Sequence, residues 1–406
     1  LHLGGNRAYA AGMDRTNELT LPASTSWLAD ADAQAVCDAI RQGGHNIYFV
    51  GGCVRNAILG LPDSDVDMST DAIPEKVMDL AKDAGLKAVP TGIEHGTVTI
   101  VSGGKGFEVT TFRRDVETDG RRAVVAFSDS MREDALRRDF TMNALYADAR
   151  GRVIDPLGGL PDLLARHVRF IDDPQARIRE DYLRILRYFR FSAWYADPHA
   201  GFEPEALAAI ASNITGLETL SAERIGAEVK KLLAAPDPAP ALAVMRQIGV
   251  LNTILPGSDD TWSSMVVHFE TLLDAPPDWR LRLAAIGGAD VAHRLRLAKV
   301  DAKHLELLKE SAFGSQAIAE VAYRHGSDVA RAVVILRACM SEQPPSLAVL
   351  ESIREGAEAR FPIRAVDLMP QYSGADLGQR LAYLERFWID SGFKAARDAL
   401  LRLPEP

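Results

Sequence analysis

The sequence predicts an α+β protein, with strands near the start of the 406-residue chain and helices after them. Residues 47–50 form a β-branched and aromatic run that is typical of a buried strand. Residues 96–101 alternate between polar and apolar, and a glycine pair then makes a hairpin turn into residues 107–112. Beyond residue 196 the chain is rich in Ala and Leu with helical spacing. We therefore expect a sheet in the first part and only helices in the remainder.

The composition is that of an ordinary globular protein. Three scattered cysteines are too few for a disulfide framework or a zinc cluster, which predicts a cytoplasmic location. No apolar stretch reaches membrane-spanning length, so no membrane partner is expected. The net charge of −10 argues against a general polycation but leaves RNA open as a partner, because charge varies locally. Residues 1–24 are expected to be a disordered leader or tag remnant.

The first candidate site follows the strand at residues 47–50. Gly51 and Gly52 lack a Cβ, so the backbone there can approach a ligand closely. A helix is predicted to follow at once, and helix N-termini attract anions. Arg55 adds a full positive charge near the start of that helix. The pattern of strand, glycine turn and helix therefore predicts a phosphate cradle.

Two carboxylates come shortly after this cradle. On a strand, residues i and i+2 point to the same face, so Asp65 and Asp67 are expected to lie side by side. Such a pair is tolerated best when hard cations sit between the two carboxylates. A glycine pair or a lone Asp-x-Asp is weak alone, but their combination in this order predicts a phosphoryl-transfer site.

These residues resemble a known signature. The string GGxVR, then LG, then DxDxxT is similar to that of the class II nucleotidyltransferases, which include the CCA-adding tRNA nucleotidyltransferases and the bacterial poly(A) polymerases. The family usually has Asp after the arginine, whereas this chain has Asn56. That change removes a negative charge near the phosphates and is expected to weaken the orientation of Arg55.

Later segments extend the resemblance. The strand at residues 107–112 resembles the family's EVTTFR strand, which implies that Glu108 is a third carboxylate at the site. Residues 114–131 show no helical period and are expected to form a long flexible loop that helps to select the nucleotide. The string RRDFTMNA resembles a family motif that contacts the triphosphate and ribose, which assigns this role to Arg137, Arg138 and Asn143.

A helix predicted over residues 178–191 carries the candidate for base recognition. Asp181, Arg184 and Arg187 lie opposite its apolar stripe, with Asp181 and Arg184 adjacent at i, i+3. A structural ion pair is the simpler explanation, but Glu180-Asp181-x-x-Arg184 resembles the family's EDxxR motif. A fixed carboxylate beside a guanidinium matches the donor and acceptor edges of cytosine and adenine and mismatches those of uracil and guanine.

The resemblance implies a small mixed-sheet nucleotidyltransferase head at residues 25–150 and a helical neck for nucleobase recognition at 151–235. Residues 236–406 are expected to form a helical body and tail that bind tRNA. The implied activity is addition of C, C and A to the tRNA 3′ end from CTP and ATP. Asp65 and Asp67, with Glu108, would hold two Mg²⁺ ions. No protein partner is predicted.

Three alternatives stay open. A poly(A) polymerase of the same family is one, although the C-terminal residues LLRLPEP are not basic. An enzyme that adds only CC or only A shares the same head motifs. A catalytically retired RNA-binding protein is the third, suggested by Asn56 and by Gly287-Gly288 where some relatives carry a His-Asp phosphohydrolase motif. The sequence does not predict the oligomeric state.

Overall fold

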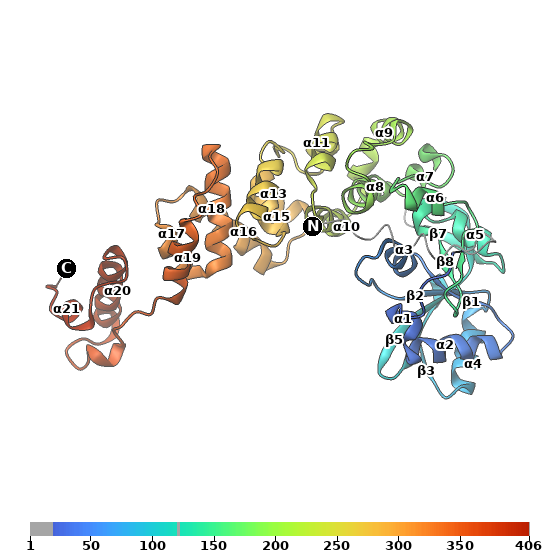
Figure 1. Cartoon of the computed structure of the whole chain (residues 1–406), viewed down its shortest axis with the longest axis horizontal. Helices are drawn as coiled ribbons and strands as arrows, with labels where there is room; N and C mark the ends of the chain where they lie inside the picture. The colour runs from blue at the N-terminus through green and yellow to red at the C-terminus, as the bar shows by residue number, and fades with distance from the viewer. Residues whose placement is uncertain (1–18, 120–121, 406) are drawn as a thin grey trace. The chain divides into compact units, whose positions relative to one another are not determined.

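The computed structural model of the chain describes residues 19–119 and 122–405 (Figure 1). It divides into two compact units. Unit 1 comprises residues up to 232 together with 244–254, and unit 2 comprises residues 233–243 and 255–406. The chain therefore passes from unit 1 to unit 2 at residue 233, returns to unit 1 for residues 244–254, and then continues in unit 2.

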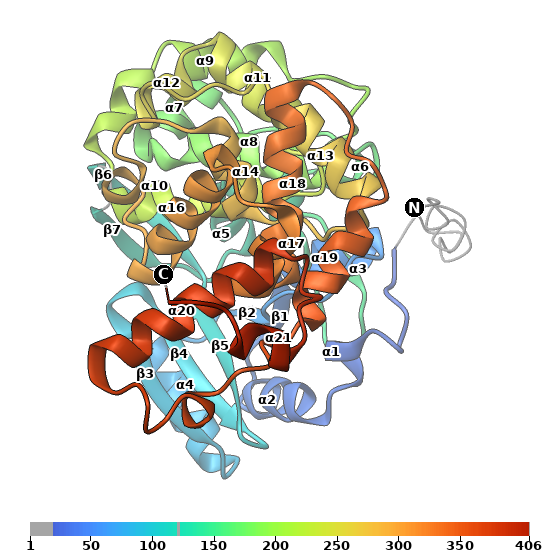
Figure 2. The ribbon, with the colours of Figure 1, turned by 90° about the vertical axis from the view of Figure 1, so that its left-hand side faces the viewer.

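Unit 1 is built on a seven-stranded mixed sheet. The strand order is β3-β4-β5-β2-β1-β8-β9, and Figure 2 shows β3, β4, β5, β2 and β1 following one another across the sheet. Only β2 and β5 pair in parallel, and the other neighbours are antiparallel. The strands are β1 Ile47–Val50, β2 Asp67–Thr70, β3 Lys87–Gly92, β4 Thr97–Ser102, β5 Lys105–Thr111, β8 Tyr146–Ala147 and β9 Val153–Ile154.

Helices cover this sheet because its strands bury alternate residues. In β4 the buried residues alternate with half-buried ones, so one face is apolar. Helices α2 (Ala31–Gln42) and α4 (Pro74–Asp83) pack on the sheet. Helix α1 (Ser26–Ala29) is followed by Asp30, whose side chain caps α2. The remaining elements of the sheet region are α3 Gly52–Leu59, η3 Ile93–His95, α5 Met131–Leu136 and η4 Thr141–Asn143.

The predicted long loop at residues 114–131 is wrong. Strands β6 (Arg113–Asp119) and β7 (Arg122–Phe127) pair antiparallel as a two-stranded hairpin of their own. Residues 122–127 read RAVVAF, and this β-propensity outweighs the polar residues before it. The run at residues 122–127 is therefore a strand signal in the sequence. The prediction of a loop overlooked it because that prediction considered only the lack of a helical period.

The predicted leader is partly outside the described residues, which begin at residue 19. Leu19 and Leu21 are buried, and the Leu21 N–H donates to the Gly151 carbonyl at 2.8 Å. Thr20 forms a β-bridge with Arg152. The prediction of a leader up to residue 24 is therefore wrong for residues 19–21, which belong to the packed structure.

The rest of unit 1 is helical. Phe140, Phe170, Tyr188 and Phe191 form an aromatic cluster, with Phe140 and Phe170 ring centroids 4.9 Å apart. This cluster joins α8 to the segments that follow α5. The helical elements are α6 Leu160–Leu164, α7 Pro174–Glu180, α8 Leu183–Tyr195, α9 Pro204–Ala211, η5 Ile214–Thr219, α10 Ala222–Leu233, α11 Ala239–Gln247 and α12 Val250–Ile254.

Unit 2 contains two apolar clusters. The larger is centred on α18 (Ser327–Ser341), and the smaller holds Leu384 and Trp388 of α20 (Gly374–Asp390). The other elements are α13 Ser263–Leu272, α14 Trp279–Ile286, α15 Val291–Arg294, α16 Lys299–Phe313, α17 Ile318–His325, α19 Val349–Glu358, η6 Ala365–Asp367 and α21 Arg397–Leu401. Among the described residues no helix is long and apolar enough to cross a membrane. The predicted fold class is confirmed, and the predicted domain boundaries stay predictions.

Candidate active site

A polar cavity of about 490 Å³ lies at the end of β1, within unit 1. Its walls come from the turn after β1, the start of β2, the segment after α5, and helices α8 and α10. Most of the side chains that line it are charged. The lining residues are Gly51, Gly52, Arg55, Asp67, Arg137, Arg138, Asp139, Asn143, Asp181, Leu183, Arg184, Arg187, Phe191 and Arg224.

The glycine turn is as predicted. Gly51 has a φ of 73°, a conformation that favours glycine, and α3 begins at the next residue. A Cβ at Gly52 would lie 2.8 Å from the Ser64 hydroxyl oxygen, so the segment that leads to β2 passes close to the turn. A Cβ at Gly51 would lie 3.4 Å from Nη1 of Arg138, which places that guanidinium beside the turn.

Arg55 is buried at the floor of this cavity. Its Nη1 donates to Asn143 at 2.6 Å, and its Nη2 donates to the Tyr195 hydroxyl at 2.8 Å. Nε and Nη2 both donate to the side-chain oxygen of Asn56, at 3.1 and 2.9 Å. Burial lowers the pKa of Arg55 from its usual value. The neutral amide of Asn56 thus orients Arg55, and the expectation that a carboxylate would orient it more strongly stays a prediction.

Arg137 and Arg138 share one buried carboxylate. Arg137 donates to Oδ1 of Asp134 at 3.0 Å, and Arg138 donates to Oδ2 at the same distance. The Tyr146 hydroxyl also donates to Asp134, at 2.7 Å. Burial alone would raise the pKa of Asp134, but the charges of Arg138 and Arg137 lower it. Asp134 therefore stays ionised and holds two guanidinium groups at the rim of the cavity.

A second ion pair, between buried Asp139 and partly exposed Arg187, also lines the cavity. Arg187 donates to Asp139, with Nε 2.7 Å and Nη2 2.5 Å from Oδ2. Asn143 donates to the other oxygen of Asp139 at 2.9 Å. Burial would raise the pKa of Asp139, but the charge of Arg187 and these hydrogen bonds lower it to about 2. The pair connects the segment after α5 to α8.

The three predicted carboxylates are only partly brought together. Asp67 begins β2 and lies in register with Glu108 on the parallel strand β5, so their side chains share a face. Asp65 precedes β2 instead of lying on it, which corrects the predicted strand arrangement. Desolvation raises the pKa of Asp67, and Glu108 and then Asp65 add to the shift while Arg138 opposes it.

These carboxylates suit a hard divalent cation. Among the described residues no group of three or more His, Cys, Asp or Glu is close enough to hold a metal ion. Desolvation is the main cause that raises the pKa of Asp67, and the charges of Glu108 and Asp65 add to it, so a cation beside these carboxylates would offset their mutual repulsion. Carboxylate oxygens are also the ligands that Mg²⁺ prefers. Asp67 and Glu108, in register on neighbouring strands, therefore supply oxygen donors of the kind that a divalent cation takes, and Asp65 lies two residues before Asp67.

The predicted Asp181–Arg184 arrangement is wrong in detail. Helix α7 ends at Glu180, Asp181 is extended, and α8 begins at Leu183, so the predicted helix over residues 178–191 is broken. Oδ2 of Asp181 accepts from Arg224 at 2.7 Å. Arg184 instead donates to Glu180 at 2.5 Å. Both side chains still line the cavity, each held by its own partner.

The sequence reasoning missed several cavity residues. Asp139 stands inside the RRDFTMNA string that supplied Arg137, Arg138 and Asn143, so its motif was a usable signal. Arg224 lies on α10, 43 residues from Asp181, and no local pattern joins the two. Phe191 was part of the predicted helix but not of the predicted site.

Comparison with known proteins agrees with this geometry. A model of the poly A polymerase head domain matches residues 47–169, and one described as a probable RNA and SrmB-binding site of polymerase A matches residues 201–261. The mitochondrial CCA tRNA nucleotidyltransferase 1 of Danio rerio is 32% identical over 381 residues, covering 87% of this chain and 86% of the relative. The CCA-adding enzyme of Geobacillus stearothermophilus is 40% identical over 230 residues, covering 56% of this chain and 54% of the relative.

A solved structure covers more of the chain. The crystal structure of the Bacillus stearothermophilus CCA-adding enzyme in complex with CTP superposes with a TM-score of 0.70 at 29% identity. It covers 89% of this chain and 93% of the other. The mixed sheet, the glycine turn and the acidic strand pair define a nucleotidyltransferase, a class of enzyme that generally needs a divalent metal ion. The chain belongs to the CCA tRNA nucleotidyltransferase family.

Proposed function

We propose that this enzyme adds C, C and A to the 3′ end of tRNA without a nucleic-acid template, using CTP and ATP. The observation that carries the proposal is the cavity itself, because it combines a glycine turn, several guanidinium groups and Asp67, which lies in register with Glu108 on the neighbouring strand. The relatives named for CCA addition and the structure with bound CTP support the substrates.

Asp65, Asp67 and Glu108 are the residues that would hold the metal, which we propose to be two Mg²⁺ ions. When bound, the metal would lower the pKa of the primer 3′-hydroxyl and neutralise charge on the triphosphate. The chain's own part is to bring the reactants together. Arg138 lies beside Gly51 and is held by Asp134, so it is positioned to bind phosphate oxygens near the N-terminus of α3. We assign Arg137, Gly52 and Asn143 to the same nucleotide site.

Base selection is proposed to involve Asp181 and Arg184, with Arg187 beside them. Arg224 donates a hydrogen bond to Asp181 and is a fourth charged residue that lines this part of the cavity. Because Asp181 and Arg184 are held by different partners, each edge of the base would meet a separately oriented group. A wrong base would leave one of these half-buried groups unpaired, which is where discrimination becomes large.

The remaining helices are proposed to bind tRNA by shape and phosphate contact. The division into head, neck, and body with tail, at residues 25–150, 151–235 and 236–406, belongs to this proposal, as does a cytoplasmic location. Burial raises the pKa of Cys53 to about 11 and of Cys37 to about 12, so both thiols stay protonated near neutral pH.

The experiment that tests the activity is extension of tRNA lacking its CCA end, with Mg²⁺ and labelled CTP or ATP, resolved at single-nucleotide length. We expect products that stop after C, C and A. A long A ladder would identify a poly(A) polymerase, and a stop after two C, or A added only to a CC end, would identify a partial enzyme. Absence of any extension would support the retired RNA-binding protein.

The Asp67→Asn variant tests the metal assignment. We expect extension to fall by roughly a thousandfold while tRNA binding persists, because binding depends mainly on phosphate and shape. We also expect Mg²⁺ to raise the melting temperature of the wild type but not of this variant. Asp63→Asn, which removes an exposed carboxylate from the same connecting segment, is the matched control and should behave as wild type. Loss of tRNA binding in Asp67→Asn would contradict the separation of metal and RNA sites.

A further inference from the structure

A second concave site lies on unit 1, at the end of β1 opposite the glycine turn. Its volume is about 580 Å³, within the range of ligand sites. Tyr48, near the start of β1, lines this cavity, whereas Gly51, after the end of β1, lines the catalytic cavity. At about 3.3 Å per strand residue the two sites are on the order of 10 Å apart. None of the residues that line the second cavity also lines the first.

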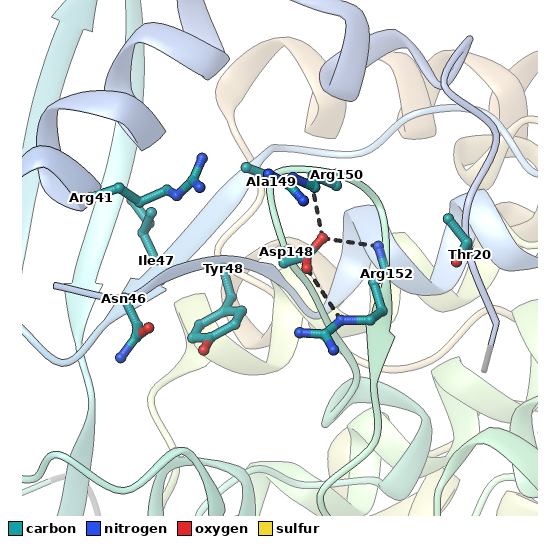
Figure 3. Close-up of a pocket in the computed structure, with 9 residues that line it drawn as sticks. All are labelled: Thr20, Arg41, Asn46, Ile47, Tyr48, Asp148, Ala149, Arg150 and Arg152. Atoms are coloured by element: carbon teal, nitrogen blue, oxygen red, sulfur yellow. Dashed lines mark hydrogen bonds and ion pairs between the residues drawn. The ribbon is translucent and has the colours of Figure 1, made fainter. Parts of the chain in front are cut away.

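The lining of this cavity is cationic. Arg41 comes from the last turn of α2, and Arg150 and Arg152 come from the turn between β8 and β9. Asp148 is the only carboxylate among the residues that line it. Figure 3 shows the three arginines around the same space, with the Tyr48 ring between Asn46 and the Arg152 guanidinium in this view. Three arginines therefore line one cavity with a single carboxylate, on a chain whose net charge is −10, while Asp38 contacts Arg41 and Asp71 lies near Tyr48.

The single carboxylate is already engaged. Oδ1 of Asp148 accepts the backbone N–H groups of Arg150 and Arg152, at 2.9 and 3.0 Å, and Oδ2 accepts Nε of Arg152 at 3.3 Å. Asp148 thus closes its own turn and neutralises Arg152. Arg41 has only a 3.6 Å contact with exposed Asp38, a surface pair of the kind that contributes little.

The turn that carries two of the arginines is held in place before any ligand binds. The Leu21 N–H donates to the Gly151 carbonyl, and the Val153 N–H donates to the Leu19 carbonyl, both at 2.8 Å. Gly151 has a φ of 85°, and a Cβ there would lie 2.8 Å from Leu28, so only glycine fits. A preorganised turn lowers the ordering cost of binding.

Neutral donors complete the wall. The pKa of Tyr48 is raised by burial and by the charges of Asp71 and Asp148, so its hydroxyl stays protonated near neutral pH and can donate a hydrogen bond. Guanidinium groups bind phosphate oxygens through two parallel hydrogen bonds, which suits a multiply charged oxyanion.

We propose that this cavity is a second anion site, which binds a phosphate group through Arg41, Arg150 and Arg152. The phosphate comes either from a small free anion, such as a nucleotide or pyrophosphate, or from the backbone of bound RNA. The RNA source rests on the proposed function, whereas the free anion does not.

The first arm of the test is titration of the full chain with inorganic pyrophosphate by calorimetry. The Arg41→Gln/Arg150→Gln double variant leaves the Asp148–Arg152 contact intact, and both positions are exposed, so the fold should persist. Lys76→Gln/Lys82→Gln removes two exposed positive charges from α4, in the same unit, and is the matched control. Arg138→Gln is a separate variant, which should lower the affinity of the catalytic cavity for pyrophosphate. We expect two pyrophosphate-binding events in the wild type and in the control. In the double variant, we expect the affinity of one of these events to fall by roughly tenfold or more.

The second arm is tRNA affinity at several salt concentrations. If the phosphate belongs to RNA, the slope of log affinity against log salt should also become shallower by roughly 1–2 in the double variant, in addition to the loss of pyrophosphate affinity. If it belongs to a free anion, only pyrophosphate binding should change. Equal pyrophosphate binding and equal salt slopes in wild type and double variant would overturn the inference. Addition of nucleotides to the tRNA 3′ end by the wild type is measured separately. Failure of the proposed function can then be told apart from failure of this inference.

Discussion

Asn56 gives the Arg55 guanidinium a neutral partner at a position where the family usually has Asp. Its amide does two things at once, because the oxygen accepts from Arg55 while the nitrogen donates to the Pro62 carbonyl at 2.8 Å. Pro62 lies in the segment that leads to Asp65 and Asp67. The Asn56 side chain therefore connects the orientation of Arg55 to the path of the acidic segment. An ionised carboxylate at this position could accept from Arg55 but could not donate to the Pro62 carbonyl.

The Asn56→Asp variant is expected to raise KM for both CTP and ATP by roughly threefold to tenfold. The carboxylate would neutralise Arg55 and would leave the Pro62 carbonyl without its donor. Steady-state tailing kinetics measure the effect. Gln42→Glu, an exposed amide-to-carboxylate change in unit 1, serves as control. Unchanged KM for both nucleotides would mean that the Pro62 contact has no bearing on the site.

At the scale of elements, the break between α7 and α8 shapes one wall of the cavity. Asp181 is released from helical geometry and its Oδ1 accepts the Leu183 N–H at 3.1 Å, which starts α8. Its other oxygen is thereby free to reach Arg224 on α10. A continuous helix would have placed Asp181 beside Arg184, as the sequence suggested, and would have left Arg224 without this contact.

The Arg224→Ala variant is expected to reduce discrimination of C and A against U and G by roughly tenfold, because Asp181 loses the group that orients it. The affinity for the triphosphate should change less. Competition between correct and incorrect nucleotides on defined tRNA ends measures the ratio. Arg179→Ala, an exposed arginine on α7 that does not line the cavity, is the control. Selectivity equal to that of the control would contradict the orienting role of Arg224.

The elements that the sequence predicted well depend on local rules. The strand, glycine turn and helix around Gly51 follow from side-chain type and from the backbone freedom of glycine, and the structure places them as expected. The break at Asp181 was not predictable in this way, because it depends on Arg224 from a distant helix. The β6–β7 hairpin was missed because its polar first strand does not show a clear period of two.

At the scale of the whole molecule, unit 2 contains a buried ion pair that anchors the start of its chain. Arg282 and Glu270 are each 3% exposed and pair at 2.7 Å. Arg282 also donates to the carbonyls of Leu233, the last residue of α10, and of Ala235 and Pro236 just after it. Burial raises the pKa of Glu270, although Arg282 opposes the shift.

Arg282→Met is therefore expected to destabilise the protein by roughly 3–5 kcal/mol, because it leaves a buried carboxylate and several carbonyls unpaired. Thermal unfolding measures the change. Glu270→Gln should cost less, since the amide can still accept from Arg282. Arg354→Met, at an exposed surface pair, should change little. An equal loss in the Arg282 and Arg354 variants would show that the buried pair does not anchor this segment.

The interleaved path of the chain limits how this protein can be dissected. Val250, Leu251 and Ile254 of α12 are buried in unit 1, although residues 233–243 before them belong to unit 2. A truncation after residue 232 would remove α12 from unit 1, and one after residue 254 would leave residues 233–243 attached without the unit they pack in. No single cut between the units yields two complete fragments, so nicking by a protease in this stretch should leave pieces that do not survive apart.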